Sequence, residues 1–449
     1  MEFSQLTSPQ IKVQDEQTAH QDLLKSNLPK SKLFAAMLDG ANQHFKHHAY
    51  KNIWLGINKL ALIHNAQFLK KRSPQQKLCA VLKSDAYGHG IDIVTPILEP
   101  LVDCYAITET HEASLIRQIS QKTIIRIRPA TALEVIQGLK EGLDIQETVG
   151  SNDQALMLGQ LAVEHKTRIK IHLNIDSTGM GRDGYSSNLK AWEITLNQIE
   201  QLLMHPGLDI VGIMGHLPKS GDVDTQAALC KVYDFVEKAF IIKEKFNLKN
   251  IETHIFSSAG LLRSHEIPLE IRCHLTMNRV GAALFGQKSF HCEDVSSLRH
   301  VMNACTFIAD VYTRYAGEQS GYGGYYTVVR EKEQHALTAG GWTIMPREAL
   351  RGDSNDRGIA PIKLVNEQGH YHDVLGNPSM NSLACNALSC NGDYLLSRND
   401  PVFIMADPAF VPGQTSNTIS HYVQSPPSRI TTTLGNPYYA ARFIIEYHE

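Results

Sequence analysis

The sequence lacks long hydrophobic runs, paired cysteines and a surplus of charge of either sign. No stretch of about 18 apolar residues is present, so we expect no membrane-spanning helix. The 8 cysteines are scattered and none forms a CxxC pair, which favours buried free thiols over a disulfide framework. A net charge of −3, spread along the chain, excludes the basic footprint of a nucleic-acid-binding protein.

The start of the chain also lacks the features of a secretory leader. Residues 1–5 bring neither a basic segment nor an apolar core, so we expect no signal peptide. This predicts a cytoplasmic protein, or a periplasmic one whose leader has been removed. A length of 449 residues allows two domains, because one hydrophobic core rarely grows beyond about 250–300 residues.

From about residue 77, short apolar runs alternate with longer amphipathic stretches. The stretches, such as 192–204 and 227–245, have helical periodicity. Strands alternating with helices indicate parallel βαβ units, and eight such units close a (β/α)8 TIM barrel. The apolar runs lie at 79–83, 104–107, 123–127, 143–147, 169–173, 210–214, 251–256 and near 271–285.

The pattern changes after about residue 300. Short strand-like runs at 307–312, 362–365 and 402–405 lie between clusters of Gly, Asn, Asp and Pro, which indicates a mostly β C-terminal domain. Before the barrel, the chain is polar apart from an amphipathic piece near 33–45. We therefore predict an α/β protein with an N-terminal extension at 1–46, a barrel at 47–298 and a β domain at 299–449.

Reactive or anion-binding side chains follow the predicted barrel strands. Lys83 ends the first run, Arg182 follows the fifth, His216 and Ser258 follow the next two, and Arg279 lies near the last. The C-terminal ends of barrel strands form the active-site face, so we expect all five on one rim. Partial burial of Lys83 lowers the pKa of its amine and favours imine formation. Taken alone, a lysine at the end of a strand more commonly lies along apolar surface with its amine in water.

Residues 80–90, with the sequence AVLKSDAYGHG, closely resemble the cofactor-lysine motif of the alanine racemase family. Residues 172–184 resemble the second signature of the family, and the extra Ser177 makes the spacing more similar to that of broad-specificity amino-acid racemases. The resemblance implies an enzyme that uses pyridoxal 5'-phosphate to interconvert L- and D-amino acids, as a homodimer with shared active sites. Further blocks match in order at 212–218, 257–260, 278–286, 379–383 and 434–437.

The resemblance also implies roles for individual residues and no metal. Lys83 would carry the cofactor as an imine and act as a base. Arg279 would face the pyridine nitrogen and, because it keeps its proton, leave the cofactor a weaker electron sink. The implied catalytic residues are Lys83, Arg279 and His216. The implied cofactor-binding residues are Lys83, Tyr87, His216, Ser258, Arg279, Gly281 and Ala282, and the implied substrate-binding residues are Arg182, Met380, Asn381 and Asn436.

Two positions depart from the pattern of dedicated alanine racemases. Asn174 stands where those enzymes often carry a carbamylated lysine. Gly341, in a gapless alignment, stands where the family supplies a second base as a tyrosine from the partner subunit. Two-base racemisation needs an acid on the face opposite the lysine, so a Gly341→Tyr substitution is expected to raise the rate.

Three functions stay open after these departures. The first is racemisation with a relaxed side-chain preference. The second is another reaction of the same cofactor that needs one base, such as a lyase, an eliminase or a one-base epimerase. The third is a catalytically inactive homologue that still binds pyridoxal phosphate.

Overall fold

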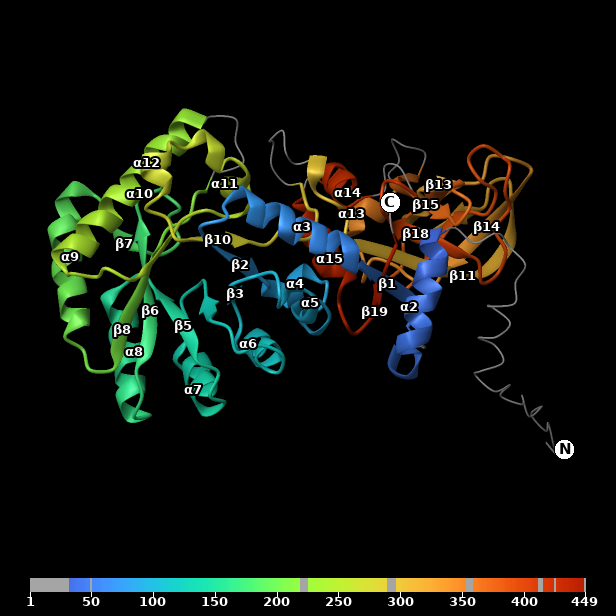
Figure 1. Ribbon diagram of the computed structural model, residues 1–449. Helices are drawn as coiled ribbons and strands as arrows, with labels where there is room; N and C mark the ends of the chain where they lie inside the picture. The colour runs from blue at the N-terminus through green and yellow to red at the C-terminus, as the bar shows by residue number, and fades with distance from the viewer. Residues whose placement is uncertain are drawn as a thin grey trace.

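The computed structural model describes residues 32–48, 51–218, 225–288, 296–352, 358–410, 415–423 and 425–447. These residues form a barrel and a β domain that lie side by side (Figure 1). The part of the predicted extension at 1–31 lies outside the described residues. No helix in the described ranges is long and apolar enough to cross a membrane.

The barrel is a ring of parallel strands in the order β10-β2-β3-β4-β5-β6-β8-β9. The Thr276 N–H donates to the Thr253 carbonyl and the Arg279 N–H donates to the Phe256 carbonyl, which joins the last two strands and closes the ring. The predicted (β/α)8 barrel is therefore confirmed. Its strands are β2 (Lys77–Val81), β3 (Cys104–Ile107), β4 (Ile124–Arg126), β5 (Ile145–Val149), β6 (Ile169–Asp176), β8 (Leu208–Met214), β9 (Glu252–His254) and β10 (Met277–Val280), with the short β7 (Tyr185–Ser186) beside β6.

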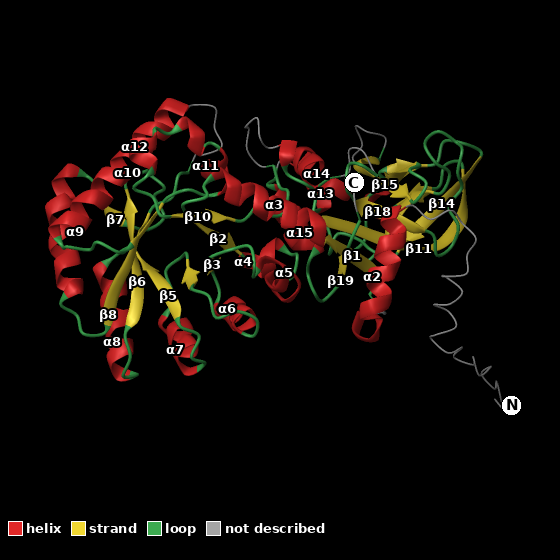
Figure 2. Cartoon of the chain, in the orientation of Figure 1, coloured by secondary structure: helices red, strands yellow, loops and turns green. Residues whose placement is uncertain are grey.

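Helices surround this ring (Figure 2). Parallel strands covered by helices are buried on both faces, which explains their near-continuous apolar sequences. The helices begin at side-chain caps where the sequence supplies them: Thr131 and Glu134 form a capping box at α7, and Asn58 caps α3. The helices are α3 (Lys59–Arg72), α4 (Lys83–Tyr87), α5 (Ile91–Leu98), α6 (Thr110–Arg117), α7 (Ala132–Lys140), α8 (Asn152–Glu164), α9 (Leu189–Leu203), α10 (Thr225–Lys245), α11 (Ser258–Leu262) and α12 (Leu269–Arg272).

The second body is built on an eight-stranded sheet in the order β14-β17-β16-β15-β18-β11-β1-β19. The predicted β domain is confirmed, and the sheet also takes in β1, which precedes the barrel in sequence and pairs with β11 and β19. Its strands are β1 (Ile53–Asn58), β11 (Met302–Tyr315), β14 (Lys332–Thr338), β15 (Ile359–Asn366), β16 (Tyr371–Leu375), β17 (Leu383–Asn386), β18 (Pro401–Met405) and β19 (Ala440–Ile445). A two-stranded ribbon of β12 (Gln319–Ser320) and β13 (Tyr326–Thr327) and the helices α13 (Arg347–Leu350), α14 (Ser416–Val423) and α15 (Pro427–Leu434) complete it.

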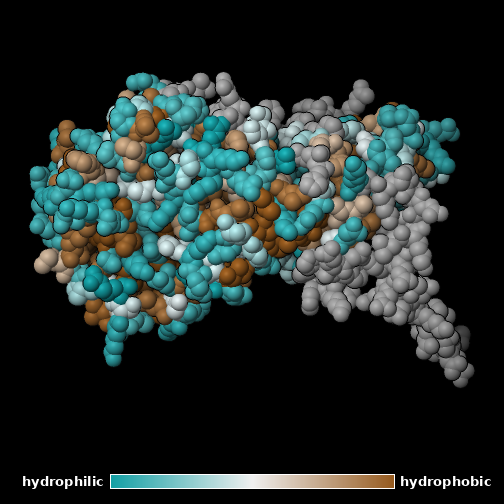
Figure 3. All heavy atoms as spheres, in the orientation of Figure 1, coloured by the Kyte–Doolittle hydropathy of each residue, from teal (hydrophilic) through white to brown (hydrophobic). Residues whose placement is uncertain are grey.

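Helix α2 (Lys32–His48) lies against the β domain rather than the barrel (Figure 1). Its apolar residues Leu33, Phe34 and Met37 are buried in one cluster with Trp54 and Phe443. The amphipathic piece predicted near 33–45 is therefore a helix with a packed face. The face of the molecule in Figure 3 is mostly hydrophilic, with an apolar area near its middle, between barrel and β domain.

Candidate active site

A cavity of about 900 Å³ opens at the C-terminal ends of the barrel strands. Its wall comes mainly from residues that end or follow β2, β4, β6, β8, β9 and β10. Residues far apart in sequence therefore meet around one space, as expected for the rim of this fold. The predicted site residues that line the cavity are Lys83, Tyr87, Arg182, His216, Ser258, Arg279, Gly281 and Ala282.

Lys83 enters this cavity directly after β2. Burial lowers the pKa of its amine and the positive charge of Arg182 lowers it further, while the carboxylate of Glu112 raises it. The Lys83 Nζ lies 5.8 Å from the centre of the Tyr87 ring. Compared with an exposed lysine, a larger fraction of this amine is uncharged and nucleophilic near neutral pH.

The backbone after Lys83 turns in the left-handed direction. Residues 84–87 have φ values between 53° and 56°, and none of them is glycine. An L-residue in this conformation costs roughly 1–2 kcal/mol relative to the right-handed helix, so contacts from outside the turn must stabilise it. The glycines Gly88 and Gly90 predict a turn here, but the left-handed residues in front of them have no marker in the sequence.

Arg279 is buried at the bottom of the cavity and contacts neutral groups. Its Nη1 donates to His254 Nδ1 and to the His254 carbonyl (3.1 Å), and its Nη2 donates to the Gly215 carbonyl (2.8 Å). The proton of His254 must then be on Nε2, which donates to His172 Nδ1 (2.9 Å). His172 in turn donates from Nε2 to Gln146 Oε1 (2.8 Å). This series of hydrogen bonds fixes the tautomers of both histidines and the orientation of the Arg279 guanidinium.

Burial, assisted by the charge of Arg279, lowers the pKa of His172 to about 3 and also lowers that of His254. Both rings are therefore neutral at physiological pH. Burial also lowers the pKa of Arg279, to about 10. Three of the five N–H donors of the guanidinium bond to described residues, which leaves two for a group bound in the cavity. Sequence reasoning missed both histidines, although polar residues alternating within apolar strands were a usable signal.

His216 lies at the end of β8 on the cavity wall. Burial lowers its pKa to about 3, and the positive charges of Arg279, Arg182 and Lys83 lower it further. The imidazole is therefore neutral at physiological pH. It offers an uncharged, flat surface to whatever occupies the cavity.

A second part of the cavity has the character of a phosphate site. Ser258 Oγ accepts hydrogen bonds from the Gly281 and Ala283 N–H groups, each at 3.2 Å, which leaves its own proton free to be donated. A Cβ atom on Gly281 would lie 2.3 Å from the Tyr87 hydroxyl, so glycine makes room for that phenol. Two hydroxyl donors beside a backbone turn fit the phosphate of pyridoxal phosphate.

Arg182 is exposed on the loop after β6. Asp176 shapes this loop by accepting hydrogen bonds from the backbone N–H groups of residues 180 and 181, both at 2.9 Å. Asn174 donates to the Asp183 carbonyl at 2.9 Å and supports the same loop. The structure thus gives Asn174 a contact with the loop that carries Arg182.

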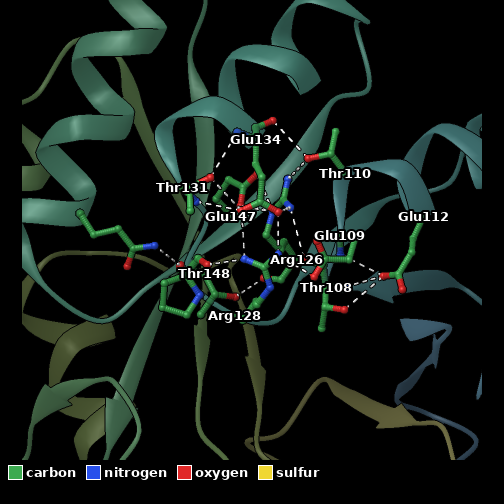
Figure 4. A network of polar contacts seen from close by, with 12 residues as sticks. Thr108, Glu109, Thr110, Glu112, Arg126, Arg128, Thr131, Glu134, Glu147 and Thr148 are labelled. Atoms are coloured by element: carbon green, nitrogen blue, oxygen red, sulfur yellow. Dashed lines mark hydrogen bonds and ion pairs between the residues drawn. The ribbon is translucent and has the colours of Figure 1, made fainter. Parts of the chain in front are cut away.

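A buried ionic network supports the neighbouring part of the rim (Figure 4). Arg126, fully buried, donates to Glu147 (2.9 Å) and to Glu134 (3.0 Å). Arg128 lines the cavity and contacts Glu134 (2.6 Å) and Glu109 (2.8 Å). Burial raises the pKa of Glu147 to about 7 against the opposing charge of Arg126. Sequence reasoning missed this network; two arginines within and just after an apolar strand were the available signal.

The predicted site residues of the β domain do not line this cavity. Met380 is 52% exposed, and Asn381 and Asn436 are also exposed. The Asn381 side chain accepts a hydrogen bond from Thr343 Oγ1 (3.1 Å). The Asn436 side chain caps the next turn of its own loop. Within a single chain these three residues are separate from the barrel cavity.

The structure shows why a larger residue does not fit at Gly341. A Cβ atom there would lie 2.2 Å from the Ser379 carbonyl oxygen and 2.5 Å from that of Met380. The two loops are joined by hydrogen bonds from the Trp342 N–H to Ser379 and from the Thr343 N–H to Met380, both at 3.1 Å. A tyrosine at this position would require the two loops to move apart, so from this geometry we expect Gly341→Tyr to bring no gain in rate.

Comparison with known proteins agrees with this geometry. Residues 57–289 match the family described as alanine racemase, N-terminal domain. The broad specificity amino-acid racemase of Vibrio vulnificus is 31% identical over 79% of this chain and 82% of its own length. That of Pseudomonas taetrolens is 30% identical over 74% and 76%.

Solved structures show the same fold. Alanine racemase of Clostridium difficile superimposes with a TM-score of 0.76 at 22% identity, over 89% of this chain and 97% of the other. The Bacillus anthracis enzyme gives 0.74 at 20% identity, over 89% and 96%. With both the sequence match and the barrel rim in place, the chain belongs to the alanine racemase family, and its relatives there include amino-acid racemases of broad specificity.

Proposed function

We propose that this protein is a pyridoxal-phosphate-dependent amino-acid racemase with a relaxed side-chain preference. One observation carries the proposal: the Lys83 amine, with its lowered pKa, shares a cavity with a set of phosphate-type donors. An uncharged amine is the form that attacks an aldehyde. The name of the Vibrio vulnificus and Pseudomonas taetrolens relatives supports the relaxed preference.

Each side chain then has a task. Lys83 holds the cofactor covalently and moves the α-proton on its own face. Tyr87 and Ser258, with the backbone at Gly281 and Ala282, bind the phosphate. The cofactor supplies an electron sink for the charge left at the substrate Cα.

The remaining cavity residues orient the reactants. Arg279, held by His254, would offer its remaining N–H donors to the pyridine nitrogen and, because a guanidinium keeps its proton, would not protonate it. Neutral His216, on the cavity wall, would pack against the cofactor ring. Arg182, at the mouth of the cavity, pairs with the substrate carboxylate.

We further propose that two chains complete each site. Met380, Asn381 and Asn436 bind no group in the cavity of their own chain, so their task as substrate residues needs the cavity of a partner. An active dimer with an inactive monomer, measured by sedimentation and activity across a concentration series, is the expected result. A fully active monomer would contradict it.

A second candidate is a one-base reaction of the same cofactor, such as retro-aldol cleavage or β-elimination. The observation that favours it is Gly341, because the phenol used by the family has no room there. Incubation with L- and D-amino acids separates the two functions. Racemisation yields the other enantiomer, whereas cleavage or elimination releases an aldehyde or a keto acid.

The test of the main proposal joins product analysis to chemical trapping. The purified protein, incubated with pyridoxal phosphate and borohydride, is expected to carry the label on Lys83. The loaded protein is then given single enantiomers of many amino acids, and chiral chromatography follows the other enantiomer. A label on another lysine, or no formation of the opposite enantiomer from any amino acid, would overturn the assignment.

A further inference from the structure

We propose that Glu112 is a positioning residue for Lys83, which it aims into the cavity by anchoring the left-handed turn that begins at Ser84. The inference rests on the proposed function, since it assigns to this turn the placement of the cofactor lysine. Arg442, from the β domain, anchors the other end of the same turn.

The turn needs anchors because its conformation is unfavourable for its residues. Ser84, Asp85, Ala86 and Tyr87 all have positive φ, and none can relax by being glycine. The two ends of the turn are closed by hydrogen bonds from the Ala86 N–H to the Leu82 carbonyl (2.8 Å) and from the Gly88 N–H to the Ser84 carbonyl (3.0 Å). Strained backbone of this kind persists where the surrounding structure over-determines it.

Glu112 fixes the start of the turn. One carboxylate oxygen accepts the Ser84 N–H at 2.5 Å. The other accepts the N–H groups of Thr108 (2.8 Å) and Glu109 (3.0 Å), which end β3 and begin α6 (Figure 4). The side chain is 5% exposed, so these three N–H groups are its main partners in place of water. The carboxylate thereby ties the residue after Lys83 to the neighbouring barrel strand.

Arg442 on β19 fixes the end of the turn. It pairs with Asp85 Oδ2, while Asp85 Oδ1 accepts the Ile91 N–H at 2.8 Å. Beside it, the backbone at Gly88 lies so close to Thr431 of α15 that a Cβ atom would come within 2.1 Å of the Thr431 carbonyl oxygen. The turn is therefore held by the barrel at its start and by the β domain at its end, so contacts of the β domain help to set the position of Lys83.

Glu112 also has an ordinary role as the third residue of the α6 capping box. A purely structural residue would change stability alone. A positioning residue changes the reactivity of Lys83 beyond what stability explains. A third role would be purely electrostatic. Losing the carboxylate lowers the pKa of Lys83 and leaves more free amine, so in that case Lys83 would react faster with the cofactor, whereas loss of positioning makes it react more slowly.

The test compares Glu112→Gln with Asn188→Ala, which removes the side-chain cap of α9 elsewhere on the barrel. The rate at which cofactor-free protein forms its covalent link with pyridoxal phosphate is measured against pH. We expect the Glu112→Gln rate to fall by about 10²-fold, as for a reacting group misplaced by an ångström, while its pH midpoint moves down. Asn188→Ala is expected to keep the wild-type rate.

A second variant and a second readout guard against trivial outcomes. Ser84→Val keeps the N–H but places a β-branched residue at positive φ, so it is expected to slow the link as Glu112→Gln does. Deuterium uptake by peptides covering 83–90, measured without cofactor, is expected to rise in both variants and not in Asn188→Ala.

The other results each overturn the inference. A faster link in Glu112→Gln would mean an electrostatic role only, and a rate equal to that of Asn188→Ala would mean a capping role only. Failure of the wild-type protein to take up pyridoxal phosphate would refute the proposed function instead. In that case the deuterium uptake still decides whether Glu112 holds the turn.

Discussion

Around the barrel rim, residues from most of the strand ends converge on one cavity, whereas the loops of the β domain that carry Gly341 and Met380 lie against each other. The rim brings together the residues that we propose hold the cofactor and move a proton on one face. The β-domain loops supply exposed Met380 and Asn381 but leave no room for a phenol at 341. Under the proposed function the chemistry is concentrated at the rim, and the β-domain loops offer no side chain at position 341 that could act as an acid or base.

The largest expected effect comes from the rim. Lys83→Ala removes both the covalent attachment of the cofactor and the base, and losing a positioned base alone costs about 10²–10⁴-fold in rate. We expect no borohydride-trapped cofactor and no measurable enantiomer interconversion. Retention of either, measured by mass spectrometry and chiral chromatography, would move the cofactor lysine elsewhere.

The next effect tests the β-domain loop. Gly341→Tyr forces a side chain into the space of two backbone carbonyls, and overpacking of this kind costs typically about 1–3 kcal/mol. We expect a lower urea midpoint and no gain in racemisation. Higher activity with unchanged stability would show that the two loops can move apart and admit the tyrosine side chain.

Acid stability extends the comparison to the barrel interior. His172, His216 and His89, which is fully buried just after the left-handed turn, each have a pKa lowered by burial to about 3, against 6.5 for an exposed histidine. The folded state therefore binds fewer protons than the unfolded state between these values. Their stabilising contribution is complete above pH 6.5 and is lost as the pH falls towards 3. Each histidine adds up to about 1.4 kcal/mol per pH unit to the slope.

Urea unfolding between pH 4 and pH 7 measures this slope. His172→Gln is expected to flatten it, with the unfolding free energy falling less steeply in acid than in the wild-type protein. An unchanged slope would indicate that His172 is protonated in the folded state.

The smallest effect is expected at the phosphate site. Ser258→Ala removes the hydroxyl that we propose donates to the phosphate, at a cost of about 1 kcal/mol because cavity water can replace it. Affinity for inorganic phosphate and for pyridoxal phosphate should fall together. A loss for pyridoxal phosphate alone would place Ser258 away from the phosphate.

The contrast between rim and loops also marks how far the sequence could predict the molecule. Alternating strands and helices predicted the barrel and the β domain, because hydrophobic periodicity reports burial directly. The same pattern placed Lys83, Arg182, His216, Ser258 and Arg279 on one rim, where the structure has them.

Other features depend on contacts between distant segments. Strand β1 precedes the barrel but joins the second sheet, which only its pairing with β11 and β19 reveals. The left-handed turn after Lys83 is imposed by Glu112 and Arg442 against the preference of its own residues. The space at Gly341 is filled by the loop at 379–381. An alignment of sequences shows which residue stands at position 341 but not which distant segment packs against it.

The most direct measurement of the difference between the two regions is loss of the α-deuteron from each enantiomer of one substrate in light water. With Lys83 on one face and no phenol at Gly341 opposite, exchange should be fast for one enantiomer and about 10²–10⁴-fold slower for its mirror image. Net racemisation should follow the slower rate. Equal and fast exchange from both enantiomers would contradict this, because it would require a second positioned base on the face of the substrate opposite Lys83.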